Sequence, residues 1–159
     1  MVTTETWVFL VYRMPRQPST PRISVWRRLK RLGVAQLGDG LVALPYDAAT
    51  KEQLEWVAHA VAEAGGEATI WITTPTVRRF GRNLAAGLAG ERAAEYREVI
   101  RRTEDALASG AGEPHRLMRT LRAMQRRIER RDHFPPPERV EARSAIDRLA
   151  IRFPDKITA

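Results

Sequence analysis

The pattern of apolar residues changes near residue 75, from one that includes strand-like blocks to one with helical spacing throughout. In the first half, short apolar blocks alternate with amphipathic stretches, and residues 7–12 (WVFLVY) form a β-branched and aromatic block that ends at a proline-rich segment. We interpret this block as a buried, central strand. From residue 75 onward, apolar residues recur at helical spacing and strand patterns almost vanish. The pattern therefore predicts strands in the first half and helices throughout the second.

A first amphipathic helix is predicted at residues 22–32. Thr20 and Pro21 offer an N-cap and a proline at the first helical position, and Gly33 is a favoured helix terminator. At about 100° per residue, this helix has one apolar face and one basic face. The apolar residues are Val25, Trp26, Leu29 and Leu32, and the basic residues are Arg27, Arg28, Lys30 and Arg31.

A hairpin, a second helix and a last strand complete the first half. Gly38-Asp39-Gly40 lies between two short apolar runs and suits a tight turn. Thr50-Lys51-Glu52-Gln53 has the form of a capping box, and the helix that follows it stops at Gly65-Gly66. Residues 68–73 form the last strand pattern. This order is the split βαβ, or ferredoxin-like, arrangement, in which two helices cover one face of a four-stranded antiparallel sheet.

Three helical stretches follow, at residues 77–108, 113–132 and 136–153. Glycines at positions 81, 87 and 90 predict that the first of them is broken or partly mobile. We therefore expect an α+β protein with a ferredoxin-like βαββαβ core at residues 1–75 and an all-helical extension at residues 76–159. The extension is expected to pack with the core as one unit.

The helical stretch at residues 113–132 is strongly basic. Its apolar residues form one narrow stripe that must pack against the protein, and they are Leu117, Leu121, Met124 and Ile128. Between its end residues Glu113 and Asp132, Glu129 is the only acidic residue of this stretch. The seven arginines away from the stripe are Arg116, Arg119, Arg122, Arg126, Arg127, Arg130 and Arg131. A guanidinium group is always charged and presents a planar fork that suits phosphate oxygens. Such a row is suited to following a nucleic-acid backbone.

The charge distribution allows two interpretations. The chain has 27 basic and 19 acidic residues, a net charge of +8, and residues 75–159 hold 19 of the basic and 12 of the acidic ones. The arginines could pair with acidic residues of neighbouring helices, namely Glu91, Glu95, Glu98, Glu104, Glu138 and Glu141. The basic excess favours contact with a polyanion instead. We predict nucleic-acid binding by Arg27, Arg28, Lys30, Arg31, Arg116, Arg119, Arg122, Arg126, Arg127 and Arg130.

Other kinds of chemistry find little support in the sequence. The chain has no cysteine, and His59, His115 and His133 lie in different elements without a second ligand at helical or hairpin spacing, so we predict no metal site. No phosphate-binding loop or nucleophile motif is present, so we predict no cofactor and no catalytic residue. The apolar run at residues 7–12 is too short to cross a membrane. The four tryptophans fall in apolar patterns, and we expect Trp7, Trp26, Trp56 and Trp71 to pack in the core.

Several segments resemble one known family in the same order along the chain. The first are WVFLVYRMP at residues 7–15, Pro18-Ser19 and VWRRLKRLG at residues 25–33. The later ones are Leu54-Glu55-Trp56, EAGGEA at residues 63–68, Glu95-Tyr96 and RRIERRDHF at residues 126–134. Together they span nearly the whole chain, and they resemble the N-terminal region of the ChrB-type chromate-resistance regulators.

This resemblance implies a cytoplasmic, DNA-binding transcription regulator linked to chromate resistance. It implies a ferredoxin-like core similar to the CRISPR spacer-acquisition subunit and to the phenylacetate repressors, and pairing as a homodimer. In the CRISPR subunits an aspartate at the end of the first strand is tied to nuclease activity, but this chain has Tyr12-Arg13-Met14 there. Full-length ChrB proteins continue into a C-terminal domain linked to the chromate response. Chromate sensing is therefore not carried over to this chain, which is expected to be a stand-alone member, a split-gene product or a fragment.

The sequence thus supports a DNA-binding regulator module that is not an enzyme. Two alternatives remain open. One is a metal-dependent nuclease with a rearranged set of acidic residues. The other is a protein-interaction module whose helical part docks on a separate sensor domain.

Overall fold

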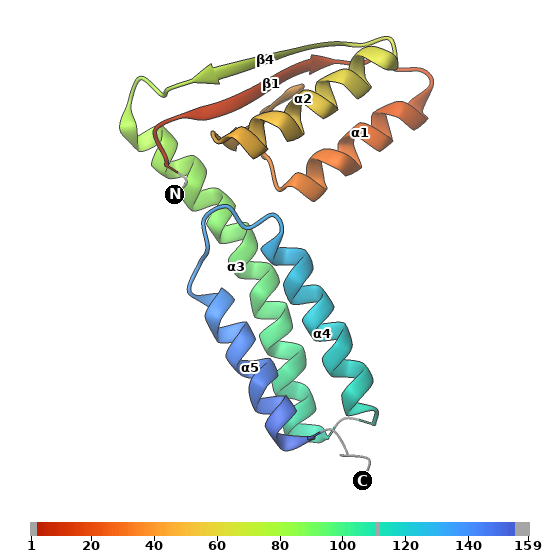
Figure 1. Cartoon of the computed structure of the whole chain (residues 1–159), viewed down its shortest axis with the longest axis vertical. Helices are drawn as coiled ribbons and strands as arrows, with labels where there is room; N and C mark the ends of the chain where they lie inside the picture. The colour runs from red at the N-terminus through yellow and green to blue at the C-terminus, as the bar shows by residue number, and fades with distance from the viewer. Residues whose placement is uncertain (1–2, 111, 155–159) are drawn as a thin grey trace. The chain divides into compact units, whose positions relative to one another are not determined.

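The computed structural model describes residues 3–110 and 112–154, which form a mixed α+β structure. Its strands and helices follow one another along the chain as shown in Figure 1. They are β1 (Trp7–Arg13), α1 (Ser19–Leu32), β2 (Ala35–Gly38), β3 (Leu41–Pro45), α2 (Ala48–Glu63), β4 (Glu67–Thr73), α3 (Arg78–Ser109), α4 (Pro114–Glu129) and α5 (Glu138–Arg152). The predicted α+β class, with a βαββαβ order followed by helices, is confirmed.

The four strands form one antiparallel sheet in the order β2-β3-β1-β4. β1 is central, as its uninterrupted apolar sequence predicts, and Phe9 has Ala43 of β3 and Trp71 of β4 as its neighbours in register. The turn between β2 and β3 uses Gly40 at a φ of 73°, a left-handed conformation that favours glycine. The Tyr12 amide donates a hydrogen bond to the Gly40 carbonyl at 2.8 Å, which fixes this turn beside the end of β1.

Helices α1 and α2 cover one face of the sheet (Figure 1). The strand period of two places Val8 and Leu10 of β1 on this face, and both are fully buried. They pack in one core with Val42 and Leu44 of β3 and with apolar residues of the two helices, which are Val25, Leu29, Leu54, Val57 and Val61. The hydrophobic effect of burying these side chains is the main force that holds the helices to the sheet.

Both predicted helix starts lie a few residues away from the observed ones. α1 begins at Ser19 with Pro18 as its N-cap, and no side chain caps it, so the proposed Thr20 cap is wrong. α2 has a capping box, but it joins Asp47 and Thr50. The Thr50 amide donates to Asp47 Oδ1 at 2.7 Å, and the Asp47 amide donates to Thr50 Oγ1 at 3.0 Å. Asp47 is thus the N-cap, and it accepts a hydrogen bond from a backbone amide that has no partner within the helix. Thr50 stands at the third helical position.

The described residues divide into two compact units, Met1–Leu88 and Ala89–Ala159. The strand patterns end near residue 75, and the boundary between the two compact units lies further along the chain, inside α3. α3 itself runs without interruption over 32 residues, so the predicted break at its glycines is wrong. In the second unit, α3, α4 and α5 enclose a separate core whose fully buried residues include Tyr96, Val99, Leu121 and Leu149.

The glycines of α3 have different surroundings. A Cβ atom at Gly81 would overlap the carbonyl oxygen of Thr4, and it would lie 3.3 Å from Nε1 of Trp7, whereas a Cβ atom at Gly87 would have no neighbour within 4 Å. Trp7 Nε1 donates to that same Thr4 oxygen at 3.1 Å, so this contact is well packed. Gly81 is therefore required by close packing, whereas Gly87 is not.

We expect opposite effects from alanine at these two positions. Gly81→Ala should lower the free energy of unfolding by about 1 to 3 kcal/mol, because the added methyl group overpacks the contact with Thr4. Gly87→Ala should raise it by about 0.5 to 1 kcal/mol, because alanine is the better helix former. Urea denaturation followed by circular dichroism measures both. Equal shifts of the two midpoints would contradict the packing described for Gly81.

Candidate nucleic-acid interface

α4 is a strongly amphipathic helix whose buried face is wider than its sequence pattern predicts. Pro114 occupies the first turn, where its missing amide is tolerated. The buried residues are Met118, Leu121, Gln125 and Ile128, and the predicted stripe residues Leu117 and Met124 are half-buried beside them. Gln125 is held by hydrogen bonds from its Nε2 to Glu129 Oε1 at 2.9 Å and to the Arg139 carbonyl at 3.2 Å. These contacts fix which face of α4 is turned outward.

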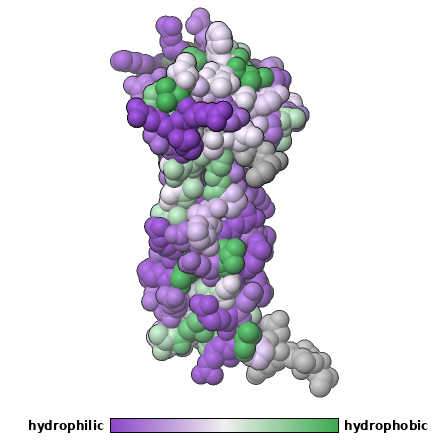
Figure 2. Space-filling view, turned by 90° about the vertical axis from the view of Figure 1, so that its left-hand side faces the viewer, coloured by the Kyte–Doolittle hydropathy of each residue, from purple (hydrophilic) through white to green (hydrophobic). Residues whose placement is uncertain are grey.

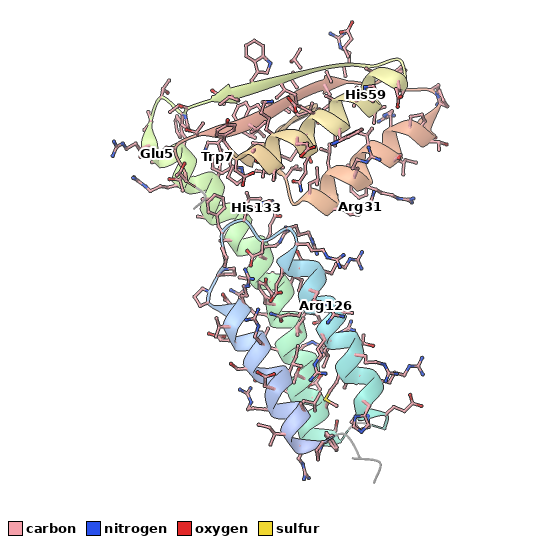
Figure 3. The ribbon with its side chains drawn as sticks, viewed as in Figure 1. Glu5, Trp7, Arg31, His59, Arg126 and His133 are labelled. Atoms are coloured by element: carbon pink, nitrogen blue, oxygen red, sulfur yellow. The ribbon has the colours of Figure 1, made fainter. Side chains whose placement is uncertain are left out.

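The outward face of α4 consists mainly of arginine. Six exposed arginines lie along it, and we refer to Arg116, Arg119, Arg122, Arg126, Arg127 and Arg130 as the α4 arginine face. At about 100° per residue they fall within an arc of roughly 140°, opposite the buried residues. At 1.5 Å per residue the row is about 21 Å long. Figure 3 shows the side chain of Arg126, one of this row, extending from α4, and Figure 2 shows the surface of the C-terminal helices as mainly hydrophilic.

Most of this face is not neutralised by acidic side chains. Arg116 Nη1 lies 3.3 Å from Glu113 Oε2, and both side chains are exposed. The other five make no ion pair or hydrogen bond through their side chains with any residue in the described parts of the chain. An exposed ion pair such as that of Arg116 contributes only about 0 to 1 kcal/mol. The guanidinium groups of the α4 arginine face are therefore accessible to an external anion.

The nearby carboxylates are engaged by other arginines. Glu98 binds Arg101 and Arg102 at 2.8 and 2.7 Å, and these hydrogen bonds lower the pKa of Glu98 to about 2. Glu138 binds Arg97 at 2.7 Å. Glu129, the acidic residue within α4, turns to α5, where Arg143 and Arg139 approach it at 2.8 and 3.6 Å. Glu98 and Glu138, two of the acids offered as partners, therefore do not pair with the α4 arginine face.

The seventh arginine of this stretch, Arg131, pairs with Glu95 of a neighbouring helix, so the interpretation of pairing with nearby acids is confirmed for this one arginine. Its two terminal nitrogens both bind the carboxylate of Glu95, and Nη1 lies 3.0 Å from Oε1. Glu95 also lies 3.0 Å from Nε of Arg92, an ion pair without the alignment of a hydrogen bond. Arg92 is only 5% exposed, and it forms a second ion pair in which its Nη2 lies 3.0 Å from Glu91 Oε2. Glu95 therefore links α3 to the segment that follows α4.

A second buried contact ties the same segment to α3. The Tyr96 hydroxyl donates a hydrogen bond to Asp132 Oδ2 at 2.8 Å. Burial is the largest cause that raises the pKa of Tyr96, and the hydrogen bond to Asp132 raises it further, so the hydroxyl remains a donor at neutral pH. Burial also raises the pKa of Asp132. Together with the Glu95 ion pairs, this contact explains why Arg131 is not part of the free row.

The second predicted basic cluster lies on α1, in the other unit. Arg27, Arg28, Lys30 and Arg31 are all exposed, and Figure 3 shows Arg31 near the end of the helix. Lys30 and Arg31 occupy the last turn, where cations interact favourably with the helix dipole. Lys30 Nζ also lies 5.6 Å from the ring centre of Trp26. The arginines of this cluster have no ion-pair partner among residues 3–110 and 112–154.

A comparison with known protein families gives one match. Residues 22–109 match the model of the N-terminal region of protein ChrB, and this range is more than half of the chain. The chain belongs to this ChrB family. No curated protein and no solved structure matches it. The ChrB match covers α1 from Arg22 onward, including its basic cluster, and the whole of α3, whereas the α4 arginine face lies beyond its end.

Three of the four tryptophans in this ChrB-family chain are not core residues. Trp7 is fully buried, as predicted, but Trp26, Trp56 and Trp71 are 53%, 62% and 58% exposed. The prediction of core packing is therefore wrong for these three. Trp56 lies on the solvent side of α2, and Trp71 lies on the face of the sheet that α1 and α2 leave open. Large exposed aromatic side chains are possible contact points for a partner.

The structure gives no support to a metal centre among the described residues. His59 pairs with Glu63 at 3.2 Å on the surface of α2, and Figure 3 shows His59 and His133 on different elements. No group of three or more histidine, aspartate or glutamate side chains in residues 3–110 and 112–154 could hold a metal ion. None of the helices in these ranges contains an apolar stretch long enough to cross a bilayer.

Proposed function

We propose that this protein is the DNA-binding module of a transcription regulator linked to chromate resistance, and that the α4 arginine face contacts the phosphate backbone. One observation carries this proposal. Five guanidinium groups stand in a row on one helix face, exposed and without a carboxylate partner in the described residues. Membership of the ChrB family supports the link to chromate resistance at the level of the family. The exposed basic cluster of α1 supplies a second positive surface for the same polyanion.

The proposed contacts are with the backbone, so they supply affinity and position more than sequence selection. Each arginine that neutralises a phosphate releases condensed counterions. A plot of the logarithm of the binding constant against the logarithm of the salt concentration therefore has a slope of about −0.9 for each contact. Six contacts from the α4 arginine face give an expected slope of about −5. Affinity should then fall roughly 10³-fold between 50 and 200 mM salt.

A salt series tests this proposal. Fluorescence anisotropy with a duplex from the region upstream of the gene, compared with a scrambled duplex of equal length, measures both affinity and sequence preference. We expect binding to both duplexes, tighter to the upstream one, with a steep salt dependence. Absence of binding at 50 mM salt, or binding that does not change with salt, would rule the proposal out.

The proposal treats the protein as a binding protein and not as an enzyme. At the end of β1, where the CRISPR subunits with a similar core place an aspartate, this chain has Tyr12-Arg13-Met14. Incubation of labelled DNA and RNA with the protein and magnesium or manganese should therefore leave both intact. Cleavage that copurifies with the protein would favour the nuclease alternative.

We also propose that the protein acts as a homodimer through the open face of the sheet. Val11, Leu37 and Trp71 are exposed there, and contiguous apolar surface is typical of association surfaces. Multi-angle light scattering is expected to give twice the mass of one chain. A monomer at micromolar concentration would contradict this part of the proposal.

A further inference from the structure

A hollow at the end of β1 combines positive charge with an exposed aromatic ring. It encloses about 780 Å³ between the end of β1, the start of α1 and the β2–β3 turn, all within the first unit. Arg13 and Arg16 line it from β1 and the following loop, and Arg22 and Trp26 line it from α1. We call this hollow the β1 pocket. None of its residues belongs to the α4 arginine face or to the predicted basic cluster of α1.

The charge of the β1 pocket is not balanced from within. Arg13, Arg16 and Arg22 are exposed, and none of them makes an ion pair or side-chain hydrogen bond with a residue in the described ranges 3–110 and 112–154. Glu67 is the neighbour of Arg13 in the register of β1 and β4, but their side chains form no ion pair. Asp39 is the one acidic residue that lines the pocket, against three arginines. The pocket therefore carries an excess of positive charge suited to a doubly charged anion.

The walls of the pocket also offer neutral contacts. Burial, and then the charge of Asp39, raise the pKa of Tyr12, so its hydroxyl stays protonated at neutral pH and can donate a hydrogen bond. A Cβ atom at Gly40 would overlap the Tyr12 carbonyl oxygen, which shows how closely the turn packs against β1. This packing holds the wall of the pocket in place.

Trp26 is the feature that the fold itself does not explain. More than half of its surface is exposed, although burying a large aromatic side chain would stabilise the protein. Lys30 lies over one face of the indole, at 5.6 Å from Nζ to the ring centre. Because Trp26 is exposed and lines the β1 pocket, its ring is accessible to a flat partner. Stacking on an aromatic ring is how proteins bind nucleic-acid bases without reading their identity.

We propose that the β1 pocket binds a nucleotide, with the phosphate held by Arg13, Arg16 and Arg22 and the base stacked on Trp26. The arginines alone would suit any small oxyanion, and Trp26 alone would suit any flat aromatic compound. Their position in one hollow is what specifies a compound that has both parts. Such a nucleotide has two possible sources, a free mononucleotide or the phosphorylated end of a single strand.

Calorimetry on the full chain distinguishes these sources. The probes are the four deoxynucleoside 5′-monophosphates, the matching nucleosides, inorganic phosphate, and a short thymidine oligonucleotide with and without a 5′-phosphate. If a monophosphate binds at least tenfold more tightly than both its nucleoside and inorganic phosphate, the ligand of the pocket is a free nucleotide. If no monophosphate binds, but the 5′-phosphate tightens oligonucleotide binding at least tenfold, the ligand is a strand end. Equal affinity for phosphate and monophosphates, or no effect of the phosphate group on any ligand, would overturn the inference.

Matched variants test the assigned residues. Trp26→Leu should weaken binding by roughly 5- to 160-fold, the range for loss of one stacked base. The control is Trp56→Leu, which removes an equally exposed tryptophan from α2 and should leave the affinity unchanged. Arg16→Gln with Arg22→Gln should weaken binding by at least about tenfold, whereas Arg79→Gln with Arg82→Gln, an equal loss of charge outside the pocket, should not. Equal losses in a variant and its control would assign the binding to another surface.

This inference does not depend on the proposed role of α4. A variant that lacks the arginines of the α4 arginine face keeps every residue of the β1 pocket, and it should bind the nucleotide probe with the affinity of the wild type. Failure of duplex binding and failure of nucleotide binding are thus separate results.

Discussion

A variant with Arg119, Arg122, Arg126 and Arg130 changed to alanine is expected to bind duplex DNA about 10³-fold more weakly than the wild type at ~0.15 M salt. The estimate follows from counterion release, which is worth about 1 kcal/mol for each arginine–phosphate contact at this salt concentration. The four side chains are exposed and lie opposite the buried face of α4, and alanine favours helix, so folding should be preserved. Anisotropy titration of the same duplex with both proteins measures the difference.

The control for this variant removes four arginines that already have carboxylate partners. Arg97, Arg101, Arg102 and Arg143 each form an ion pair with a glutamate or aspartate. Their replacement with alanine changes the net charge by the same amount, but it removes no guanidinium group from the α4 arginine face. We expect this control to lose less than tenfold in affinity. If both variants lose the same affinity, overall charge and not the α4 arginine face accounts for binding.

Glu95→Ala is expected to destabilise the protein by about 3 kcal/mol. Removal of this carboxylate leaves the side chain of Arg131 without its carboxylate partner, and it leaves Glu91 as the one carboxylate bound to the buried guanidinium group of Arg92. Breaking a buried ion pair from one side costs about 3 to 5 kcal/mol, and we take the lower end because Glu95 itself is partly exposed. Urea denaturation followed by circular dichroism measures the loss.

Glu104→Ala is the matched control on the same helix. Glu104 is exposed and has no ion-pair partner in the described parts of the chain, so its replacement should change the free energy of unfolding by no more than about 0.5 kcal/mol. Similar midpoints for the Glu95 and Glu104 variants would show that the ion pairs of Arg92 and Arg131 do not hold α3 to the segment after α4.

The fold could be predicted because its elements follow simple periods. Residues of β1 alternate between the two faces of the sheet, and α2 repeats its buried residues every three to four positions. The glycine-bracketed turn before β3 was also visible, because Gly40 needs a positive φ. The helix start at Asp47 was missed because Asp47 and Thr50 are both good N-caps, and only the end of β3 decides between them.

The exposed tryptophans were missed although their positions carried the necessary information. Trp56 lies about 200° around the helix from Leu54, which places it opposite the buried face. Trp71 alternates with the half-buried Ile70 in β4 and therefore lies on the other face of the sheet. The position of each tryptophan around its helix or along its strand indicates which side chains are exposed. The general preference of tryptophan for the interior gave the wrong prediction.

The two candidate sites differ in what a sequence can reveal. The α4 arginine face was visible because its residues lie on one helix, but its freedom from carboxylates depends on how Glu129 and Glu138 are used by other helices. The β1 pocket was not visible, because Arg13, Arg22 and Asp39 come from separate segments that only the folded chain brings together. No spacing along the sequence marks such a site.

The most direct measurement is an NMR titration that follows the Nε–Hε signals of individual arginines while duplex DNA is added at low salt. We predict that the largest changes occur at Arg119, Arg122, Arg126, Arg127 and Arg130, and that Arg97 and Arg101, which are held by carboxylates, change little. Unchanged signals along the α4 arginine face while DNA is bound elsewhere on the protein would contradict the account.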